Sequence, residues 1–430
     1  MPHLRTSTDL NTSSVTAEWL PLLEGSAALE ATDRLTSITA DLSRVGATEV
    51  PFGSQIDLAL YFTYLFRALR DQRHLAMASR WRDTVVSRMA HLPLRPGLYG
   101  GLAGVAWMTE HTYDRTMHDE KSESGDANEE VDRALTNLVE RRPWEREYDL
   151  IGGLVGFGVY FLERLPRPSA RYALGQIVER LDELARITEV GICWYTPVTR
   201  LPEWQQRIAP KGYYNLGLAH GIPGIVALLS RCIRNAISVD VCSRLLTGTV
   251  DWLLAMEKPA GHGCRFDVWV THTRASERAS RLAWCYGDVS VAMALYSAGV
   301  ATRTSRWIDL SHNILIECGD RLDDRSGIQD AGICHGSAGL AHIYNRFFQD
   351  SGDLRFRRLA EHWFGRIVEV HAPSGYGGFQ SFFPRTLDGS ENKVAWRTDA
   401  SFLTGSSGIG LVLLAGVSRL APDWDRRLLL

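Results

Sequence analysis

The chain has 430 residues, of which 45% are hydrophobic and 23% charged, so it can bury a sizeable core and has the composition of an ordinary globular protein. Its net charge of −3 gives no basic field of the kind that nucleic-acid binding requires, so we expect no nucleic-acid partner. No apolar run reaches the roughly 18 residues that span a bilayer, and the polar N-terminus has no apolar signal core, so we expect a cytoplasmic protein without a transmembrane segment.

A short pattern, in which a glycine turn leads directly into an apolar run, recurs along the whole chain. Its copies are PFGSQIDLALYF (51–62), which is the weakest, GLYGGLAGVAWM (97–108), LIGGLVGFGVYF (150–161), LAHGIPGIVALL (218–229), WCYGDVSVAMAL (284–295), ICHGSAGLAHIY (333–344) and FLTGSSGIGLVL (402–413). The turn glycines, at positions 53, 101, 153, 221, 287, 336 and 405, are 48 to 69 residues apart. Each repeat is therefore long enough for two helices and their loops.

Two kinds of helix are expected in each repeat. Runs directly after the turns, such as IVALL (225–229), are apolar on nearly every side, which is typical of a helix buried all round. The segments between them are apolar on one face, as in the stripe of Ile177, Leu181, Leu184 and Ile187 and in similar stripes over 131–138 and 307–314. This alternation predicts an all-α (α/α) toroid of seven inner and seven outer helices, formed by residues 1–430 as a single domain.

Three segments interrupt the helical pattern. Residues 189–214, 259–282 and 371–400 mix aromatic residues, Pro and Gly without helical period, and each segment runs into a glycine turn. In a barrel such loops gather at one end, where sites are usually built. We expect them to surround the mouth of an active site and to hold a small β-containing insertion.

Thiol and imidazole side chains recur at equivalent positions in consecutive turns. Cys285 and Cys334 each lie two residues before a turn glycine and His335 lies one before it, so all three are expected at a common mouth. Two thiolates and one imidazole can bind Zn²⁺ and leave a fourth position for water or substrate. The alternative is that these cysteines are small buried hydrophobes, which is our interpretation of the other five, Cys193, Cys232, Cys242, Cys264 and Cys318.

Four further residues near the turns could carry chemistry. His220 and Tyr286 each directly precede a turn glycine; an imidazole there could exchange a proton near neutral pH, or it could hold a backbone carbonyl. Asp149 precedes its turn glycine by four residues, as either a helix N-cap or a catalytic carboxylate. Arg281 either forms a surface ion pair or supports a carboxylate at the site.

Together these motifs resemble a known family. NLGLAHGIPGI (215–225), RLAWCYGD (281–288) and ICHGSAGL (333–340) are similar to the signatures of the lanthipeptide cyclases, the lanthionine synthetase C-like family of the nisin-cyclase type, and YDLIGGLVG and SFLTGSSGIG fall in the expected order. The resemblance implies an α/α toroid with one zinc ion per chain, bound by Cys285, Cys334 and His335. It also implies catalytic roles for Asp149, His220, Arg281 and Tyr286. One departure is visible, because Val289-Ser290 stands where the family often has Pro-Gly, which is expected to alter the turn after Tyr286.

The resemblance also implies a reaction. A cysteine thiol of a dehydrated precursor peptide would add to dehydroalanine or dehydrobutyrine to form a lanthionine or methyllanthionine ring, with His220 and Asp149 moving the proton. The expected partner is this precursor peptide, and the resemblance allows a membrane-associated complex with a dehydratase and an exporter. Two alternatives stay open, a glutathione-adding relative that uses the same zinc and a non-catalytic scaffold or peptide-binding module.

Overall fold

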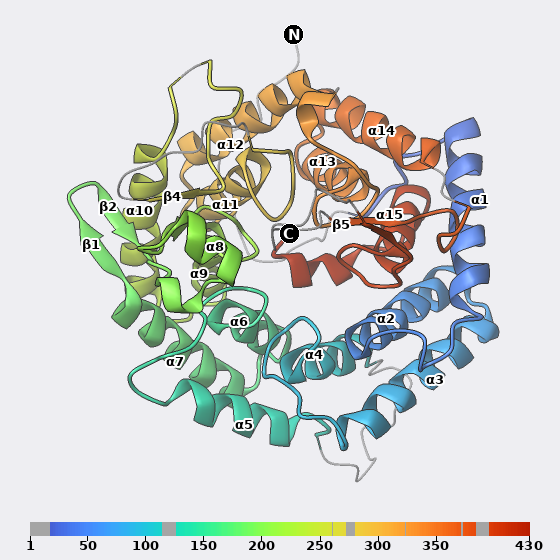
Figure 1. Cartoon of the computed structure of the whole chain (residues 1–430), viewed down its shortest axis with the longest axis horizontal. Coiled ribbons are helices and arrows are strands. Elements are labelled where there is room, and N and C mark those ends of the chain that lie inside the picture. The colour runs from blue at the N-terminus through green and yellow to red at the C-terminus, as the bar shows by residue number, and fades with distance from the viewer. Residues whose placement is uncertain are drawn as a thin grey trace, which may run out of the picture.

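Two concentric rings of helices make up the part of the chain that the computed structural model describes, residues 18–113, 126–259, 261–271, 280–322, 324–370, 373–383 and 395–430 (Figure 1). Within these residues the inner ring has seven helices, α2 (Phe52–Leu69), α4 (Leu102–Thr112), α6 (Leu154–Glu163), α9 (Ile222–Arg234), α11 (Asp288–Thr302), α13 (Ser337–Ser351) and α15 (Ser406–Val417). The described outer ring also has seven, α1 (Gly25–Leu42), α3 (Gln72–Met89), α5 (Glu129–Val139), α7 (Pro168–Leu184), α10 (Val239–Ala255), α12 (Ser305–Cys318) and α14 (Leu354–Glu369). The predicted all-α toroid is confirmed.

The two rings differ in burial as their sequences predict. Every residue of α15 from Ser406 to Gly416 is buried, whereas α5 buries one stripe that includes Val131, Leu135 and Val139. An inner helix needs contact on all sides, and closing the ring provides it. Although the inner helices are apolar, no helix in the described ranges is both long and apolar enough to cross a membrane.

The predicted stripe on α7 is wrong at its last residue. Ile177 and Leu181 are buried on the helix, but α7 ends at Leu184 and Ala185 takes an extended backbone conformation. Ile187 instead lies on strand β1 (Arg186–Thr188), where its side chain is 82% exposed. Its spacing of three residues from Leu184 continues the helical period by coincidence, and periodicity alone cannot locate a helix end.

The ring is closed by its first and last helices. The outer helices α3, α5, α7, α10, α12 and α14 pack on the inner helix that precedes each of them, whereas α1 packs on α15. The segment before α1 strengthens this closure, because Trp19 Nε1 donates to Ala415 O at 2.8 Å and the backbone N–H groups of Leu22 and Leu23 donate to Gly416 O. Two chain regions almost 400 residues apart thus complete the same repeat.

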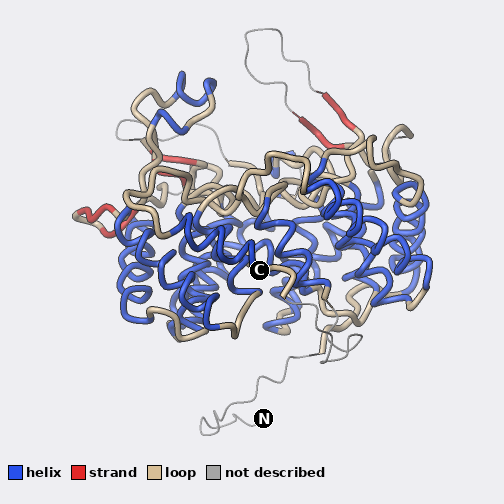
Figure 2. The backbone as a smooth tube through the Cα atoms, turned by 90° about the horizontal axis from the view of Figure 1, so that it is seen from below, coloured by secondary structure: helices blue, strands red, loops and turns tan. Residues whose placement is uncertain are grey.

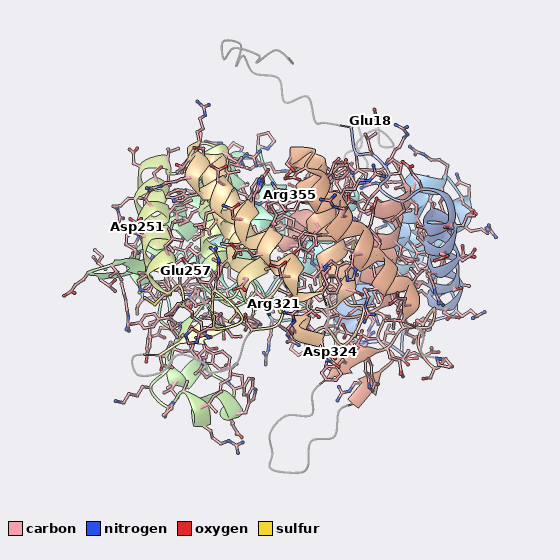
Figure 3. The ribbon with its side chains drawn as sticks, turned by 90° about the horizontal axis from the view of Figure 1, so that it is seen from above. Glu18, Asp251, Glu257, Arg321, Asp324 and Arg355 are labelled. Carbon is pink, nitrogen blue, oxygen red and sulfur yellow. The ribbon has the colours of Figure 1, made fainter. Side chains whose placement is uncertain are left out.

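Short strands and irregular segments gather at one end of the toroid (Figure 2). Three antiparallel pairs occur in the described residues, β1 with β2 (Gly191–Cys193), β3 (Tyr214–Asn215) with β4 (Trp269–Val270), and β5 (Ser381–Phe383) with β6 (Ala395–Arg397). Helix α8 (Glu203–Ile208) lies at the same end, whereas Glu18 lies at the opposite end (Figure 3). The predicted β content is confirmed there, but residues 203–208 form a helix in a segment for which no helical period was predicted. Residues 260, 272–279, 371–372 and 384–394 lie outside the described part.

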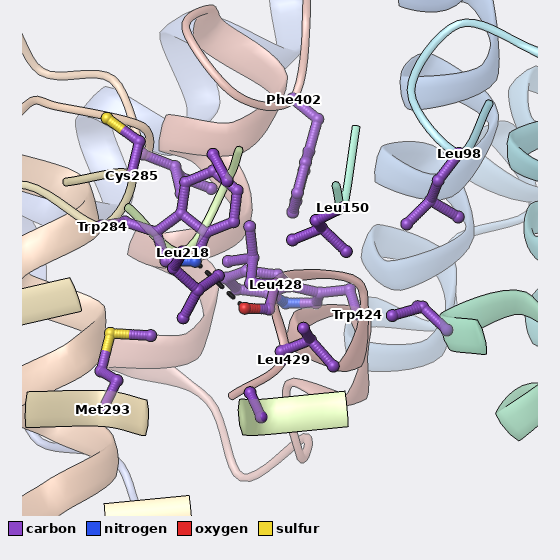
Figure 4. Close-up of a cluster of buried hydrophobic side chains, with 14 of the residues drawn as sticks. Leu98, Leu150, Leu218, Trp284, Cys285, Met293, Phe402, Trp424, Leu428 and Leu429 are labelled. Atoms are coloured by element: carbon purple, nitrogen blue, oxygen red, sulfur yellow. Dashed lines mark hydrogen bonds between the residues drawn. The ribbon is translucent and has the colours of Figure 1, made fainter. Parts of the chain in front are cut away.

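The C-terminal segment fills the centre of the ring. The 3₁₀ helix η4 (Asp423–Leu428) and the two residues after it place Trp424, Leu428 and Leu429 in the core. Around them lie six fully buried residues, each three positions before a turn glycine: Leu98, Leu150, Leu218, Trp284, Ile333 and Phe402, most of which Figure 4 labels. Trp284 Nε1 donates to Leu428 O at 3.0 Å (Figure 4). This apolar plug therefore lies directly beneath the turns that carry the predicted site.

Candidate functional site

The glycine turns bring backbone segments closer than any side chain would allow. Glycine caps the N-terminus of six described inner helices, from α4 to α15. A Cβ on Gly221 would lie 2.3 Å from Asn215 O, and a Cβ on Gly336 would lie 2.3 Å from Gly332 N. Both glycines have negative φ, so space rather than backbone conformation requires them. The turns can consequently crowd around one mouth.

A belt of backbone hydrogen bonds joins successive turns around this mouth. Its members run from Leu98 N to Ile151 O (3.0 Å), Leu150 N to Ala219 O (3.2 Å), Ala219 N to Cys285 O (3.4 Å), Cys285 N to Cys334 O (3.3 Å) and Cys334 N to Leu403 O (2.7 Å). Because these residues lie two or three positions before their turn glycines, the belt fixes the backbone from which the predicted site residues project.

The belt is closed by an ion pair. Phe402 N donates to Asp57 Oδ2 at 2.9 Å, and Arg427 Nη1 donates to Asp57 Oδ1 at 2.7 Å. Arg427 also donates to Leu98 O in the turn that carries Gly101. Asp57 and Arg427 are both buried. In the weak first copy of the repeat, this ion pair therefore takes the place of the backbone hydrogen bond that joins the other turns.

Cys285, Cys334 and His335 form a candidate metal centre. One ligand atom from each lies within 4.8 Å of the other two, and this is the one such group of three or more in the described part of the chain. The hydrogen bond from Cys334 lowers the pKa of the Cys285 thiol well below its usual range, burial opposes this, and His335 and the charge of Arg281 lower it further. Among the described atoms, Nε2 of His335 is buried without a hydrogen-bond partner. Thiolate and imidazole ligands with an orphaned buried nitrogen fit a Zn²⁺ ion.

His220 and Asp149 form a hydrogen-bonded pair beside this centre. His220 Nδ1 lies 2.5 Å from Asp149 Oδ2, and Asp149 Oδ1 accepts a hydrogen bond from Gly152 N at 2.8 Å. Burial acts to lower the pKa of His220, but the hydrogen bond and charge of Asp149 outweigh it and the pKa is raised. The N-cap alternative for Asp149 is wrong, because Gly153 caps α6, and His220 bonds this carboxylate and not a backbone carbonyl.

Tyr286 stacks near the His220 ring, with ring centroids 6.3 Å apart and planes 25° from parallel. Burial raises the pKa of Tyr286 well above its usual range, and a hydrogen bond with the side chain of Asn215 opposes the rise only in part. The sequence argument missed Asn215, whose Oδ1 also accepts from Gly217 N at 2.8 Å. Its signal was available, because Asn215 precedes its turn glycine by six residues, as Arg281 does in its own repeat.

Ser290 explains the departure after Tyr286. In the five other turns whose glycine caps an inner helix, the third residue after the cap is again glycine, and a Cβ there would lie 1.8 to 2.4 Å from the carbonyl oxygen six residues earlier. Here the cap, Gly287, has φ +81°, whereas the other five caps have φ between −108° and −143°. This left-handed cap reroutes the turn and accommodates Ser290, whose Oγ accepts a hydrogen bond from Leu218 N at 2.6 Å. The turns of Tyr286 and His220 are thereby joined.

One cavity of about 890 Å³ collects all seven predicted site residues, Asp149, His220, Arg281, Cys285, Tyr286, Cys334 and His335. The same cavity is also lined by residues that the sequence argument did not single out, among them Trp204, Tyr213 and Trp269. The arrangement places around one space two thiols and an imidazole that could hold a soft metal ion, a hydrogen-bonded His–Asp pair and a neutral phenol. Such a site can activate a thiol and deliver a proton to the atom that accepts it.

Known proteins are similar to this chain in sequence and in fold. The family model described as lanthionine synthetase C-like protein matches residues 57–429. The nisin biosynthesis protein NisC of Lactococcus lactis subsp. lactis is 25% identical over 287 residues, which cover 62% of this chain and 65% of that protein, slightly less than two thirds of its length. The solved structure of nisin cyclase has a TM-score of 0.72 at 19% identity, covers 94% of this chain and 98% of its own, and shares the toroidal fold.

Proposed function

The chain belongs to the lanthionine synthetase C-like family, and from this premise we propose that it is a zinc-dependent lanthipeptide cyclase. It would join cysteine thiols of a dehydrated precursor peptide to dehydroalanine or dehydrobutyrine residues of the same peptide. The observation that carries the proposal is the placement of the Cys285, Cys334 and His335 ligand atoms within 4.8 Å of one another, in the cavity that also contains His220 and Asp149.

Cys285, Cys334 and His335 would hold the Zn²⁺ ion. When bound, Zn²⁺ supplies Lewis acidity that lowers the pKa of a thiol. The reaction needs no other reactant: the thiol sulfur bonds to the β-carbon of the dehydrated residue, the carbon–carbon π bond breaks, and the α-carbon gains the proton that the thiol loses. Product and substrate therefore have the same mass.

His220 is assigned the proton transfer. Asp149 holds Nδ1 of the imidazole, which leaves Nε2 to accept the thiol proton or to protonate the α-carbon. The raised pKa of His220 favours a proton donor near neutral pH. Tyr286 stays a neutral phenol that can donate a hydrogen bond to the developing enolate, and the Arg281 guanidinium in the same cavity adds favourable charge.

The test uses a dehydrated peptide that carries one cysteine, with cyclisation followed as loss of free thiol at unchanged mass. Wild-type protein should cyclise it, and His220→Gln should slow the reaction roughly 100- to 10,000-fold while zinc content stays the same. His91→Gln, at an exposed histidine outside the cavity, should behave as wild type. An unimpaired His220→Gln variant would favour a scaffold. Coupling of added glutathione to a cysteine-free dehydrated peptide, without cyclisation of the first, would favour the glutathione-adding alternative.

A further inference from the structure

Part of the lining of this cavity is apolar and rich in aromatic rings. It is formed by Leu201, Pro202, Trp204, Tyr213 and Trp269, which we call the aromatic wall. These residues come from the two loops around α8 and β4, far apart in sequence, and they share one cavity with Cys285 and His220. A cavity of about 890 Å³ exceeds what one thiol and one alkene need and is near the upper end of the range for small-molecule sites.

The aromatic wall is built as a unit. The ring of Tyr213 stacks on that of Trp269 at 5.3 Å and 12°, and Trp204 meets Trp269 edge-on at 6.5 Å. Leu201, Ala209 and Tyr213 form a small apolar cluster of their own, against which Trp269 packs. Pairing of β3 with β4 joins the two loops, and the hydrogen bond from Tyr213 Oη to Gln205 Oε1 at 2.9 Å holds Tyr213 against α8. The wall can therefore present a fixed surface to a ligand.

The three aromatic side chains of the wall differ in their exposure to solvent. Tyr213 is 4% exposed and buttresses the stack, whereas Trp204 and Trp269 are half-buried and line the cavity. The aromatic wall itself has no charged side chain. The Asp, Glu and Arg residues that line the cavity lie outside the wall: Arg95, Glu147, Asp149, Arg200 and Arg281. Half-exposed tryptophans next to a reactive centre offer area that an apolar side chain could cover.

We infer that the aromatic wall binds an apolar side chain of the peptide substrate, next to the residues that react. This inference rests on the proposed function and narrows its substrate class. Glutathione has two carboxylates, one ammonium and no apolar side chain beyond its thiol, so it gains nothing from such a wall. A peptide with leucine, isoleucine or an aromatic residue beside its reacting positions buries that side chain against Trp204 and Trp269.

Binding of unreactive peptides tests the inference separately from catalysis. We would use a short Gly/Ser peptide with alanine and serine in place of the dehydroalanine and cysteine, and a set in which leucine occupies each flanking position in turn. Calorimetry on wild-type protein should find at least one position where leucine tightens the Kd roughly tenfold or more. The gain should disappear in Trp269→Ala and shrink in Trp204→Ala.

Trp396→Ala is the matched control, since Trp396 is 46% exposed on β6 and does not line the cavity; it should keep the full gain. The inference is overturned if leucine improves binding at no position, or if the improvement persists in both wall variants. If the protein prefers leucine peptides but cyclises no dehydrated peptide, the inference about the aromatic wall holds and the proposed function is wrong. If the protein cyclises a dehydrated peptide but shows no preference for leucine, the proposed function holds and the inference about the aromatic wall is wrong.

Discussion

Asp149 uses its two carboxylate oxygens for two different contacts. Oδ1 accepts from Gly152 N within the glycine turn, and Oδ2 holds Nδ1 of His220. An asparagine at this position can keep the first contact while removing the charge from the second. Asp149→Asn is therefore the substitution that separates the two tasks.

The pH dependence of turnover follows from this pair. The pKa of His220 is raised because the hydrogen bond and charge of Asp149 outweigh the effect of burial. If protonated His220 gives its proton to the α-carbon, turnover is present below this pKa and is lost as pH rises through it. Asp149→Asn lowers the pKa, so the falling limb of kcat against pH should move to lower pH in cyclisation assays. A limb that stays in place would exclude His220 as the group that sets it.

Ser290 should matter for stability because it gives a buried N–H its partner. Ser290→Ala leaves Leu218 N without its acceptor, at a cost of about 1–3 kcal/mol in the free energy of unfolding. Ser230 is the control, since it is equally buried but its hydroxyl donates to Val226 O within its own helix. Ser230→Ala should cost less than about 1 kcal/mol. Equal losses in urea unfolding would contradict the role assigned to Ser290.

At the scale of the element, glycine is required in the turns but not everywhere in the helices. A Cβ on Gly408, in the first turn of α15, would lie 1.8 Å from Phe402 O, whereas a Cβ on Gly365, within α14, would meet nothing within 4 Å. Gly408→Ala should destabilise the protein by about 1–3 kcal/mol or more. Gly365→Ala should stabilise it by about 0.5–1 kcal/mol, because alanine favours a helix. Thermal unfolding of the two variants should thus shift in opposite directions, and a shift in the same direction would be inconsistent with the packing of the turns.

The elements that the sequence predicts best are those with a repeating signal. The inner helices follow glycine turns and the outer helices have an apolar stripe, so both rings were predicted together with the equivalence of Cys285 and Cys334. Contacts between non-repeating segments were not predictable, such as the packing of α1 on α15 or of Trp269 on Tyr213. The distance between His220 and Asp149 also required the folded chain, because the two residues occupy non-equivalent positions in their repeats.

The end of α7 and the turn at Ser290 show the limit of local patterns. The change from helix to strand before Ile187 interrupts no apolar period, so it could not be seen in the spacing. Val289-Ser290 signalled an altered turn, but its geometry depends on the left-handed conformation of Gly287 and on a hydrogen bond to a neighbouring repeat. Both features depend on backbone conformation and long-range contacts, which a local sequence pattern does not reveal.

At the scale of the whole molecule, the belt of turns depends on the contact between α2, the first inner helix, and the C-terminal segment. Asp57, on α2, is 6% exposed and Arg427, near the C-terminus, is 1% exposed, and their ion pair closes the belt of turns. Arg427→Met leaves a buried carboxylate without its partner and should destabilise the protein by about 3–5 kcal/mol. Arg419→Met, which breaks the exposed pair with Glu18, should change stability by less than about 1 kcal/mol. Denaturant unfolding measures both changes. Similar losses of unfolding free energy in the two variants would contradict the role assigned to the Asp57–Arg427 pair.

Two expectations about the molecule's organisation stay predictions. One is that residues 1–430 form a single domain, and the other is a membrane-associated complex with a dehydratase and an exporter. The first predicts one cooperative unfolding transition by all probes. The second predicts co-purification from cells that express all three proteins.

The central claim is the three-ligand zinc site, and metal content tests it most directly. Elemental analysis of protein purified without chelators should find about one zinc per wild-type chain, strongly reduced in folded Cys285→Ala, Cys334→Ala and His335→Ala. Cys193→Ala, at a buried cysteine on β2 outside this cluster, should retain the metal. A folded wild-type protein without zinc, or variants that keep it, would contradict the account.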